Sequence, residues 1–142
     1  MITVIIPTYN RQDLLISLLG HLEKFHEIDE VIVVDSSLSI NPEIKKIRNL
    51  NLKYISTSVA SAALQRNIGL DAVNKDTEFV FFLDDDVVPT ADYFSTLLKD
   101  LRDQETVGVS GIVVNRDKIL HRTQPKPHQR IFHRMFLLDS LS

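Results

Sequence analysis

The most constraining feature of this sequence is an apolar run that ends abruptly in three carboxylates. Residues 79–83 read Phe-Val-Phe-Phe-Leu, and Asp84, Asp85 and Asp86 follow directly. An apolar run of this length without polar alternation is typical of a strand buried on both faces, as in a parallel sheet. In open α/β sheets, ligands bind beyond the carboxyl ends of the strands. The run therefore predicts a ligand site at such an edge.

The three adjacent carboxylates also predict a cation. They repel one another, and a hard divalent ion with oxygen ligands would relieve that repulsion. The alternative is that one aspartate only caps the helix predicted after Pro89. A cap uses one carboxylate, so the presence of three favours a binding site.

The composition narrows the class of protein. A length of 142 residues suits one domain, and the net charge of −3 gives no reason to expect nucleic-acid binding. The absence of cysteine excludes disulfides and thiolate metal sites, which fits a reducing, cytoplasmic compartment. No apolar run approaches a membrane span and no signal peptide is apparent, so peripheral contact at the inner face of a membrane is the membrane association left open.

Strand and helix patterns alternate along most of the chain. This alternation predicts an α/β fold with a mainly parallel sheet, right-handed crossovers and helices on both faces. The predicted strands are 2–6, 31–34, 52–56, 79–83 and 107–114, and the predicted helices are 11–25, 42–48, 62–73 and 91–102. The predicted helix caps are Asn10, Ser58 or Ser61, and Thr90.

The predicted α/β domain covers residues 1–114, and its character changes at residue 115. Residues 115–142 are rich in arginine, lysine and histidine, with only Asp117 and Asp139 as acids. Two interpretations stay open for this basic tail, a solvated tail and a functional lid.

Polar side chains follow three of the predicted strands. They are Pro7 to Arg11 after the first strand, Asp35 after the second and the acidic cluster after the fourth. In a parallel sheet all of these lie along one edge. Such a set suits a mononucleotide, because an acid can accept a base N–H, an aromatic ring can stack and a metal can bridge a carboxylate to the diphosphate.

Four segments, in order and spacing, resemble the nucleotide-binding half of a family 2 glycosyltransferase. That family has the A-type glycosyltransferase fold, a Rossmann-like arrangement, and the resemblance covers about residues 1–114. The segments are Val-Ile-Ile-Pro-Thr-Tyr-Asn-Arg at 4–11, Val-Ile-Val-Val-Asp-Ser-Ser at 31–37, Ala-Leu-Gln-Arg-Asn-Ile-Gly-Leu at 63–70 and Phe-Leu-Asp-Asp-Asp at 82–86. Ser36 departs from the family pattern, which often has an acid there.

The resemblance implies a role for each residue on the base side of the site. Pro7, Thr8 and Tyr9 would line the base pocket, and Asp35 would contact the base, typically uracil. Arg66 would reach the same pocket from its helix. The open alternatives are that Tyr9 rests on the first helix, that Asp35 is only a turn residue and that Arg66 is solvated.

The resemblance also implies roles on the phosphate side. Asp84 would approach the ribose, and Asp86 would ligate Mg²⁺ or Mn²⁺ at the diphosphate. Arg11 and Asp85 complete the predicted nucleotide-binding set, although the position of Asp85 varies in the family.

The implied activity is transfer of a sugar from a nucleotide-diphosphate sugar, with UDP as the expected nucleotide. The acceptor would be a glycan, a lipid or a small molecule, and the family's usual outcome is inversion with a carboxylate base. In the family that base and the acceptor-binding half lie beyond residue 142, so no catalytic residue is assigned. Residues 115–142 are interpreted as the start of a missing or truncated acceptor-binding region.

Other functions fit parts of the pattern. A non-catalytic nucleotide-sugar-binding module, or a fragment without the acceptor half, is the first alternative, and an uncovered sheet edge leaves a homo-oligomer open. A haloacid dehalogenase-type phosphatase is the second, because residues 84–88 read Asp-Asp-Asp-Val-Val. That family places the motif after its first strand, whereas here it falls past mid-chain. A receiver-type signalling domain requires acids after the first strand, where this chain has Pro-Thr-Tyr-Asn.

Overall fold

The computed structural model describes residues 1–103 and 106–112. The chain forms two compact units, Met1–Pro89 and Thr90–Ser142. The first unit contains the sheet and all of the residues predicted to bind a ligand. The predicted boundary between residues 114 and 115 lies outside the described residues.

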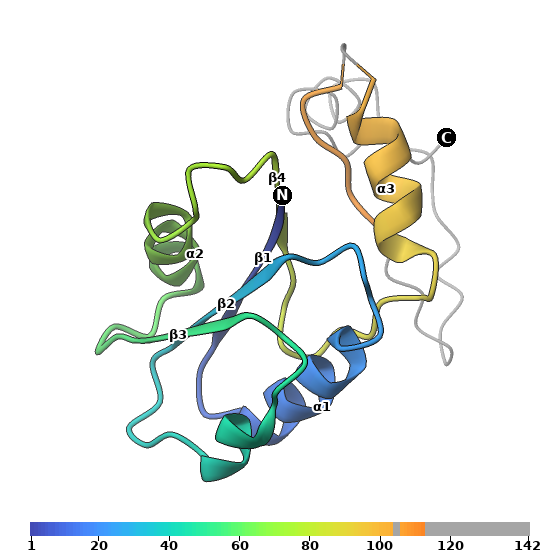
Figure 1. Ribbon diagram of the computed structural model, residues 1–142. Coiled ribbons are helices and arrows are strands. Elements are labelled where there is room, and N and C mark those ends of the chain that lie inside the picture. The colour runs from blue at the N-terminus through green and yellow to red at the C-terminus, as the bar shows by residue number, and fades with distance from the viewer. Residues whose placement is uncertain (104–105, 113–142) are drawn as a thin grey trace, which may run out of the picture. The chain divides into compact units, whose positions relative to one another are not determined.

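The first unit is built on a parallel sheet of four strands, β1 (Ile2–Thr8), β2 (Glu30–Asp35), β3 (Leu52–Ser56) and β4 (Phe79–Phe82). Their order across the sheet is β3-β2-β1-β4 (Figure 1). The two central strands are buried almost throughout, as their unbroken apolar sequences predict. The predicted α/β fold with a parallel, Rossmann-like sheet is confirmed.

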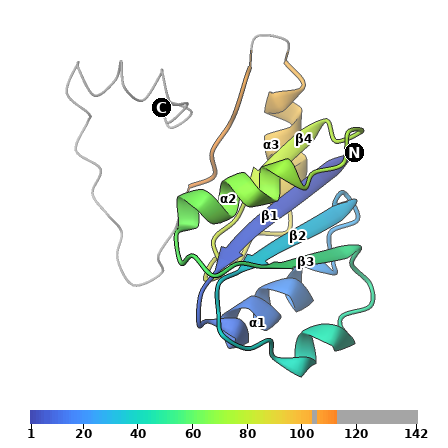
Figure 2. The same cartoon turned by 90° about the vertical axis from the view of Figure 1, so that its left-hand side faces the viewer.

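Two helices cover opposite faces of this sheet. Helix α1 (Gln12–Leu22) joins β1 to β2, and helix α2 (Ala62–Asp71) joins β3 to β4. These two crossovers run in opposite directions across the sheet, so right-handed connections place their helices on opposite faces, as Figure 2 shows. A short 3₁₀ helix, η1 (Pro42–Lys46), lies between β2 and β3.

The predicted burial of strand β4 needs a correction. Its sequence predicts burial on both faces, but the side chain of Phe82 is 43% exposed. Within the described residues β4 pairs with β1 alone, so it forms one edge of the sheet rather than its interior. The apolar run identified the strand correctly and overestimated its burial.

The second unit contains helix α3 (Tyr93–Leu101). The sequence predicts a buried stripe of Phe94, Leu97, Leu98 and Leu101 on this helix; the first three are buried and Leu101 is half-buried. The strand predicted at 107–114 is wrong for residues 107–112, which form no strand. Two glycines interrupt this stretch, and a Cβ on Gly111 would lie 2.5 Å from the Tyr93 ring. Residues 113 and 114 lie outside the described residues.

The helix caps were predicted with mixed success. Ser61 caps α2 as predicted. Asn10 does not cap α1, because Arg11 holds that position and Asn10 has a left-handed φ of 54°. Thr90 does not cap α3 either, since Asp92 holds the N-cap position and accepts a hydrogen bond from the Thr90 hydroxyl.

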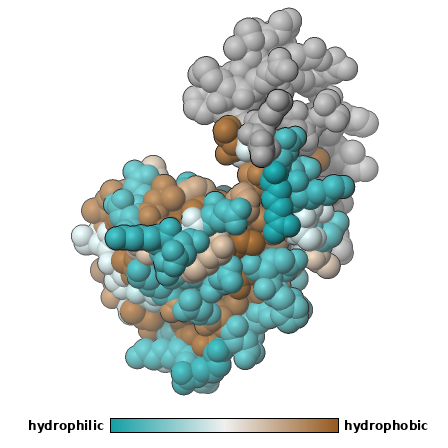
Figure 3. All heavy atoms as spheres, turned by 45° about the horizontal axis from the view of Figure 1, so that its top comes forward, coloured by the Kyte–Doolittle hydropathy of each residue, from teal (hydrophilic) through white to brown (hydrophobic). Residues whose placement is uncertain are grey.

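Apolar surface is scattered on the face shown in Figure 3, where hydrophobic residues (brown) lie among hydrophilic ones (teal). None of the helices within residues 1–103 and 106–112 has the length and apolar character needed to cross a bilayer.

Gly69 allows α2 to pack closely on β1. A Cβ at Gly69 would overlap the Cγ2 atom of Ile5, a fully buried core residue. We expect Gly69→Ala to lower the free energy of unfolding by about 1–2 kcal/mol, because overpacking outweighs the gain in helix propensity. Gly20→Ala is the matched control, since nothing lies within 4 Å of a Cβ there. Urea unfolding should show the control to be neutral or stabilised, and equal effects of the two substitutions would contradict the close contact.

Candidate functional site

The predicted polar residues do meet at one edge of the sheet. Thr8 at the end of β1 lies beside Asp35 at the end of β2, and Phe82, which leads into the acidic cluster, lies beside Ile5. The carboxyl ends of the parallel strands therefore bring the loops after β1, β2 and β4 together, as the sequence predicts.

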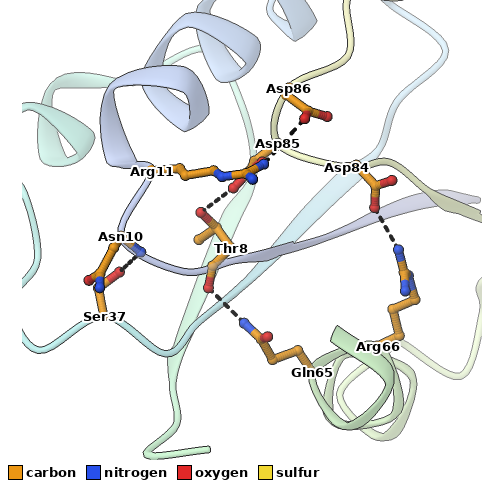
Figure 4. A network of polar contacts seen from close by, with 9 residues as sticks. All are labelled: Thr8, Asn10, Arg11, Ser37, Gln65, Arg66, Asp84, Asp85 and Asp86. Atoms are coloured by element: carbon orange, nitrogen blue, oxygen red, sulfur yellow. Dashed lines mark hydrogen bonds and ion pairs between the residues drawn. The ribbon is translucent and has the colours of Figure 1, made fainter. Parts of the chain in front are cut away.

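The acidic cluster after β4 is tied to the loop after β1 by Asp85. The Thr8 hydroxyl donates a hydrogen bond of 2.7 Å to Asp85 Oδ2, and the Arg11 guanidinium lies 3.3 Å from Asp85 Oδ1 (Figure 4). Asp85 is only 6% exposed. With both oxygens engaged and little exposure, Asp85 anchors the cluster.

The other two aspartates are open to solvent, and each meets an arginine. Asp86 is 53% exposed and lies 3.2 Å from Arg11, whereas Asp84 is 60% exposed and lies 2.5 Å from Arg66. Figure 4 shows Arg66 reaching Asp84 from α2 and Arg11 reaching Asp85 and Asp86 from the loop after β1. Two arginines of the same chain thus contact the acidic cluster, and the predicted divalent cation stays a prediction.

A pocket of about 280 Å³ opens between these loops. It brings together seven of the nine residues predicted to bind a nucleotide or metal. Asp35 and Arg66 are not among its lining residues. The lining residues are Pro7, Thr8, Tyr9, Arg11, Ala60, Ala62, Gln65, Asp84, Asp85 and Asp86.

Asp35 is enclosed rather than presented to the pocket, being 1% exposed. Its Oδ1 accepts hydrogen bonds from the backbone N–H and the hydroxyl of Ser37, at 2.7 and 2.5 Å. Its Oδ2 accepts from the Gln12 amide at 2.8 Å and from the Tyr54 hydroxyl. Each oxygen of the Asp35 carboxylate therefore already accepts two hydrogen bonds from other groups of the protein.

These contacts set the acidity of both partners. Burial by itself raises the pKa of Asp35, but the hydrogen bonds from Ser37, Tyr54 and Gln12 outweigh burial and leave that pKa below its usual value. Burial, with the adjacent Asp35 charge, raises the pKa of the Tyr54 phenol. Asp35 is thus an ionised acceptor and Tyr54 a neutral donor at neutral pH.

Gln65 is a site residue that the predictions from sequence do not include. Its side chain is 2% exposed, and its amide donates hydrogen bonds of 2.7 Å to the carbonyl oxygens of Thr8 and Val34. These carbonyl groups belong to the last residue of β1 and the next-to-last residue of β2, so one side chain of α2 joins the ends of two strands. The signal for Gln65 was its place in the segment 63–70, one of the four segments that carry the family resemblance.

The donor set fits a divalent cation in part. Asp86 offers exposed carboxylate oxygens, which Mg²⁺ and Mn²⁺ prefer, whereas Asp84 contacts Arg66. Among the described residues, no three aspartate, glutamate, histidine or cysteine side chains are placed so that they could hold a metal ion together. An ion held by Asp86 would therefore take its remaining ligands from a bound diphosphate and water, as Mg²⁺ does at substrate phosphates.

Comparisons with known proteins place the chain in a family. Residues 3–140 match the family described as Glycosyl transferase family 2. No curated protein matches the chain closely enough to count as a relative.

Among solved structures, TarS from S. aureus is 31% identical, with a TM-score of 0.56 over 70% of this chain and 19% of that one. A truncated form, TarS 1-349, is 32% identical, with a TM-score of 0.60 over 70% of this chain and 32% of that one. The mannosyltransferase PcManGT from Pyrobaculum calidifontis, in complex with GDP-Man and Mn²⁺, is 27% identical, with a TM-score of 0.68 over 82% of this chain and 36% of that one. The chain thus spans between about a fifth and about a third of the length of these proteins.

Proposed function

The chain belongs to glycosyl transferase family 2, and on that premise we propose that it binds a nucleotide-diphosphate sugar whose sugar is transferred to an acceptor. The observation that carries the proposal is the pocket in which the acidic cluster faces the loop after β1. Opposite charges and an exposed aromatic ring meet there at the carboxyl edge of a parallel sheet, where nucleotides bind in such folds.

The base would lie against Pro7, Thr8 and Tyr9. Tyr9 is 51% exposed, so its ring is available for stacking. Asp35 takes an indirect part in this proposal, because a base could reach its carboxylate only by replacing a present partner such as Tyr54.

The ribose would lie near Asp84, and the diphosphate near Asp86 and Arg11. Arg66, predicted for the base pocket, contacts Asp84, so we now place it on the ribose side. Asp86 would hold Mg²⁺ or Mn²⁺, which would neutralise charge on the departing nucleoside diphosphate. The Mn²⁺ in the mannosyltransferase complex supports an ion in this role. Arg11 adds positive charge on the same side, and its planar guanidinium suits phosphate oxygens.

UDP is the nucleotide that we propose, and GDP is its competitor because the mannosyltransferase neighbour binds GDP-Man. The acceptor, a glycan, lipid or small molecule, and the carboxylate base for inversion are not assigned to any residue. Asp117 and Asp139 lie outside the described residues. The cytoplasmic location, at or away from a membrane surface, and self-association stay predictions.

A non-catalytic binding module is the second candidate. Such a module would use the same pocket to hold the nucleotide-sugar without transferring the sugar. The haloacid dehalogenase alternative is set aside by the family match and by the position of the acidic motif after β4, not β1.

Calorimetry on the 142-residue chain tests the binding proposal. We expect UDP to bind in the presence of Mn²⁺, with at least about a tenfold loss of affinity when EDTA removes the metal. GDP in place of UDP measures the base preference. Equal binding of free phosphate and both nucleotides, with or without metal, would contradict a nucleotide site. A transfer assay with UDP-sugars, on this chain and on a longer one, then separates an enzyme from a binding module.

A further inference from the structure

The Arg11 guanidinium contacts Asp86, the carboxylate that is predicted to hold a metal ion. Its Nη1 atom lies 3.3 Å from Asp85 Oδ1 and 3.2 Å from Asp86 Oδ2, so one cationic group bridges two adjacent carboxylates (Figure 4). This bridge neutralises the same charge that a divalent ion would neutralise.

The two halves of the bridge differ in strength. Asp85 is 6% exposed, and its second oxygen is held by the Thr8 hydroxyl at 2.7 Å. Asp86 is 53% exposed, and Arg11 is its partner among the described residues. Exposed ion pairs are weak because solvent screens them, so the contact with Asp86 is the one that breaks first. Arg11 can then leave Asp86 and stay on Asp85.

We propose that Arg11 competes with the divalent cation for Asp86, and that the donor's diphosphate relieves this competition by giving Arg11 phosphate oxygens instead. The inference rests on the proposed nucleotide site. In this proposal Thr8 holds Asp85, and Asp85 positions Arg11. The Arg11 guanidinium then turns from Asp86 to the diphosphate. Metal and nucleotide binding are consequently coupled, and each ligand raises the affinity for the other by the same factor.

Replacing Arg11 separates the two parts of the coupling. We expect Arg11→Gln to bind Mn²⁺ alone about threefold more tightly than wild type, within the range that exposed ion pairs contribute. The same variant should bind UDP in the presence of Mn²⁺ more weakly, because the phosphate contact is lost. The factor by which UDP raises Mn²⁺ affinity should fall about tenfold.

The experiment measures free Mn²⁺ by electron paramagnetic resonance during titration of the full chain, with and without UDP. Lys46→Gln is the charge-matched control, because Lys46 is exposed and pairs with Glu43 on η1. Arg66→Gln removes an arginine that meets Asp84 and not Asp86. Arg11→Lys keeps the charge and should restrain Mn²⁺ binding as the wild type does. Thermal unfolding of each variant confirms that it is folded.

Tighter Mn²⁺ binding in Arg11→Gln, but not in Lys46→Gln or Arg66→Gln, supports the competition. Unchanged or weaker Mn²⁺ binding in Arg11→Gln overturns it, as does an equal gain in all three variants or no Mn²⁺ binding without UDP in any of them. If wild type binds UDP with Mn²⁺ in those cases, the proposed function stands while the competition fails. If wild type binds neither ligand in any combination, the proposed function itself fails.

Discussion

Asp86→Ala is expected to weaken UDP binding in the presence of Mn²⁺ by at least about tenfold, nearly as much as removal of the metal, because it removes the exposed carboxylate that would hold the ion at the diphosphate. The fold should survive, since Asp86 is 53% exposed and its contact with Arg11 is a solvent-screened pair. Calorimetry at fixed Mn²⁺ measures the loss. The affinity for UDP without metal should change little, because the Asp86 carboxylate then has no metal ion to hold.

The matched control is Asp76→Ala. Asp76 is exposed and precedes β4, whereas Asp86 follows it, so the control removes the same charge at the opposite end of the strand. Its UDP affinity should stay within about twofold of wild type, as expected of a distant screened charge. Retention of metal-dependent binding by Asp86→Ala would place the ion elsewhere.

Asp35→Asn is expected to cost about 3 kcal/mol of unfolding free energy at pH 7. The carboxylate accepts four hydrogen bonds in a place that is 1% exposed, and an amide would turn an N–H group toward existing donors. Tyr54→Phe, which removes only one donor, should cost about 1 kcal/mol. Urea unfolding measures both. Equal costs would show that Tyr54 alone carries the stabilisation.

The Asp35 network also predicts the direction of a pH effect. The pKa of Asp35 is lowered in the folded protein, so its ionised form stabilises the fold above about pH 4, the unfolded value. That contribution is lost as the pH falls toward the lowered pKa. The stability gap between wild type and Asp35→Asn should therefore narrow below about pH 4. A constant gap from pH 7 to pH 3 would show that ionisation of Asp35 does not stabilise the fold.

The parallel sheet could be predicted because its signals are local. Strands β1 and β2 are runs of β-branched residues without alternation, and such runs rarely form anything but buried strands. The shared edge then follows from topology alone. Helix starts were less predictable, because Asn10 adopts a left-handed conformation that its sequence context does not reveal.

The site was harder to predict where it depends on partners far away in sequence. The acidic cluster predicted a cation, but nothing local showed that Arg11 and Arg66 would meet it. The sequence predicts Asp35 as a residue at the open edge of the sheet, but it does not show that the Tyr54 hydroxyl on β3 donates a hydrogen bond to it. From the sequence, Gln65 is an ordinary polar residue of a helix. In the structure it is buried, and its amide donates hydrogen bonds to carbonyl oxygens at the ends of two strands.

The Gln65 amide has a consequence for how the pocket meets its ligand. Because it fastens the ends of β1 and β2 to α2 with two bonds of 2.7 Å, the spacing of those ends is set before any ligand arrives. A ligand then pays little ordering entropy for the pocket floor. The exposed ring of Tyr9, and not the strand ends, would then adjust to a larger or smaller base. Substitutions at Tyr9 are therefore the ones expected to change which nucleotide binds.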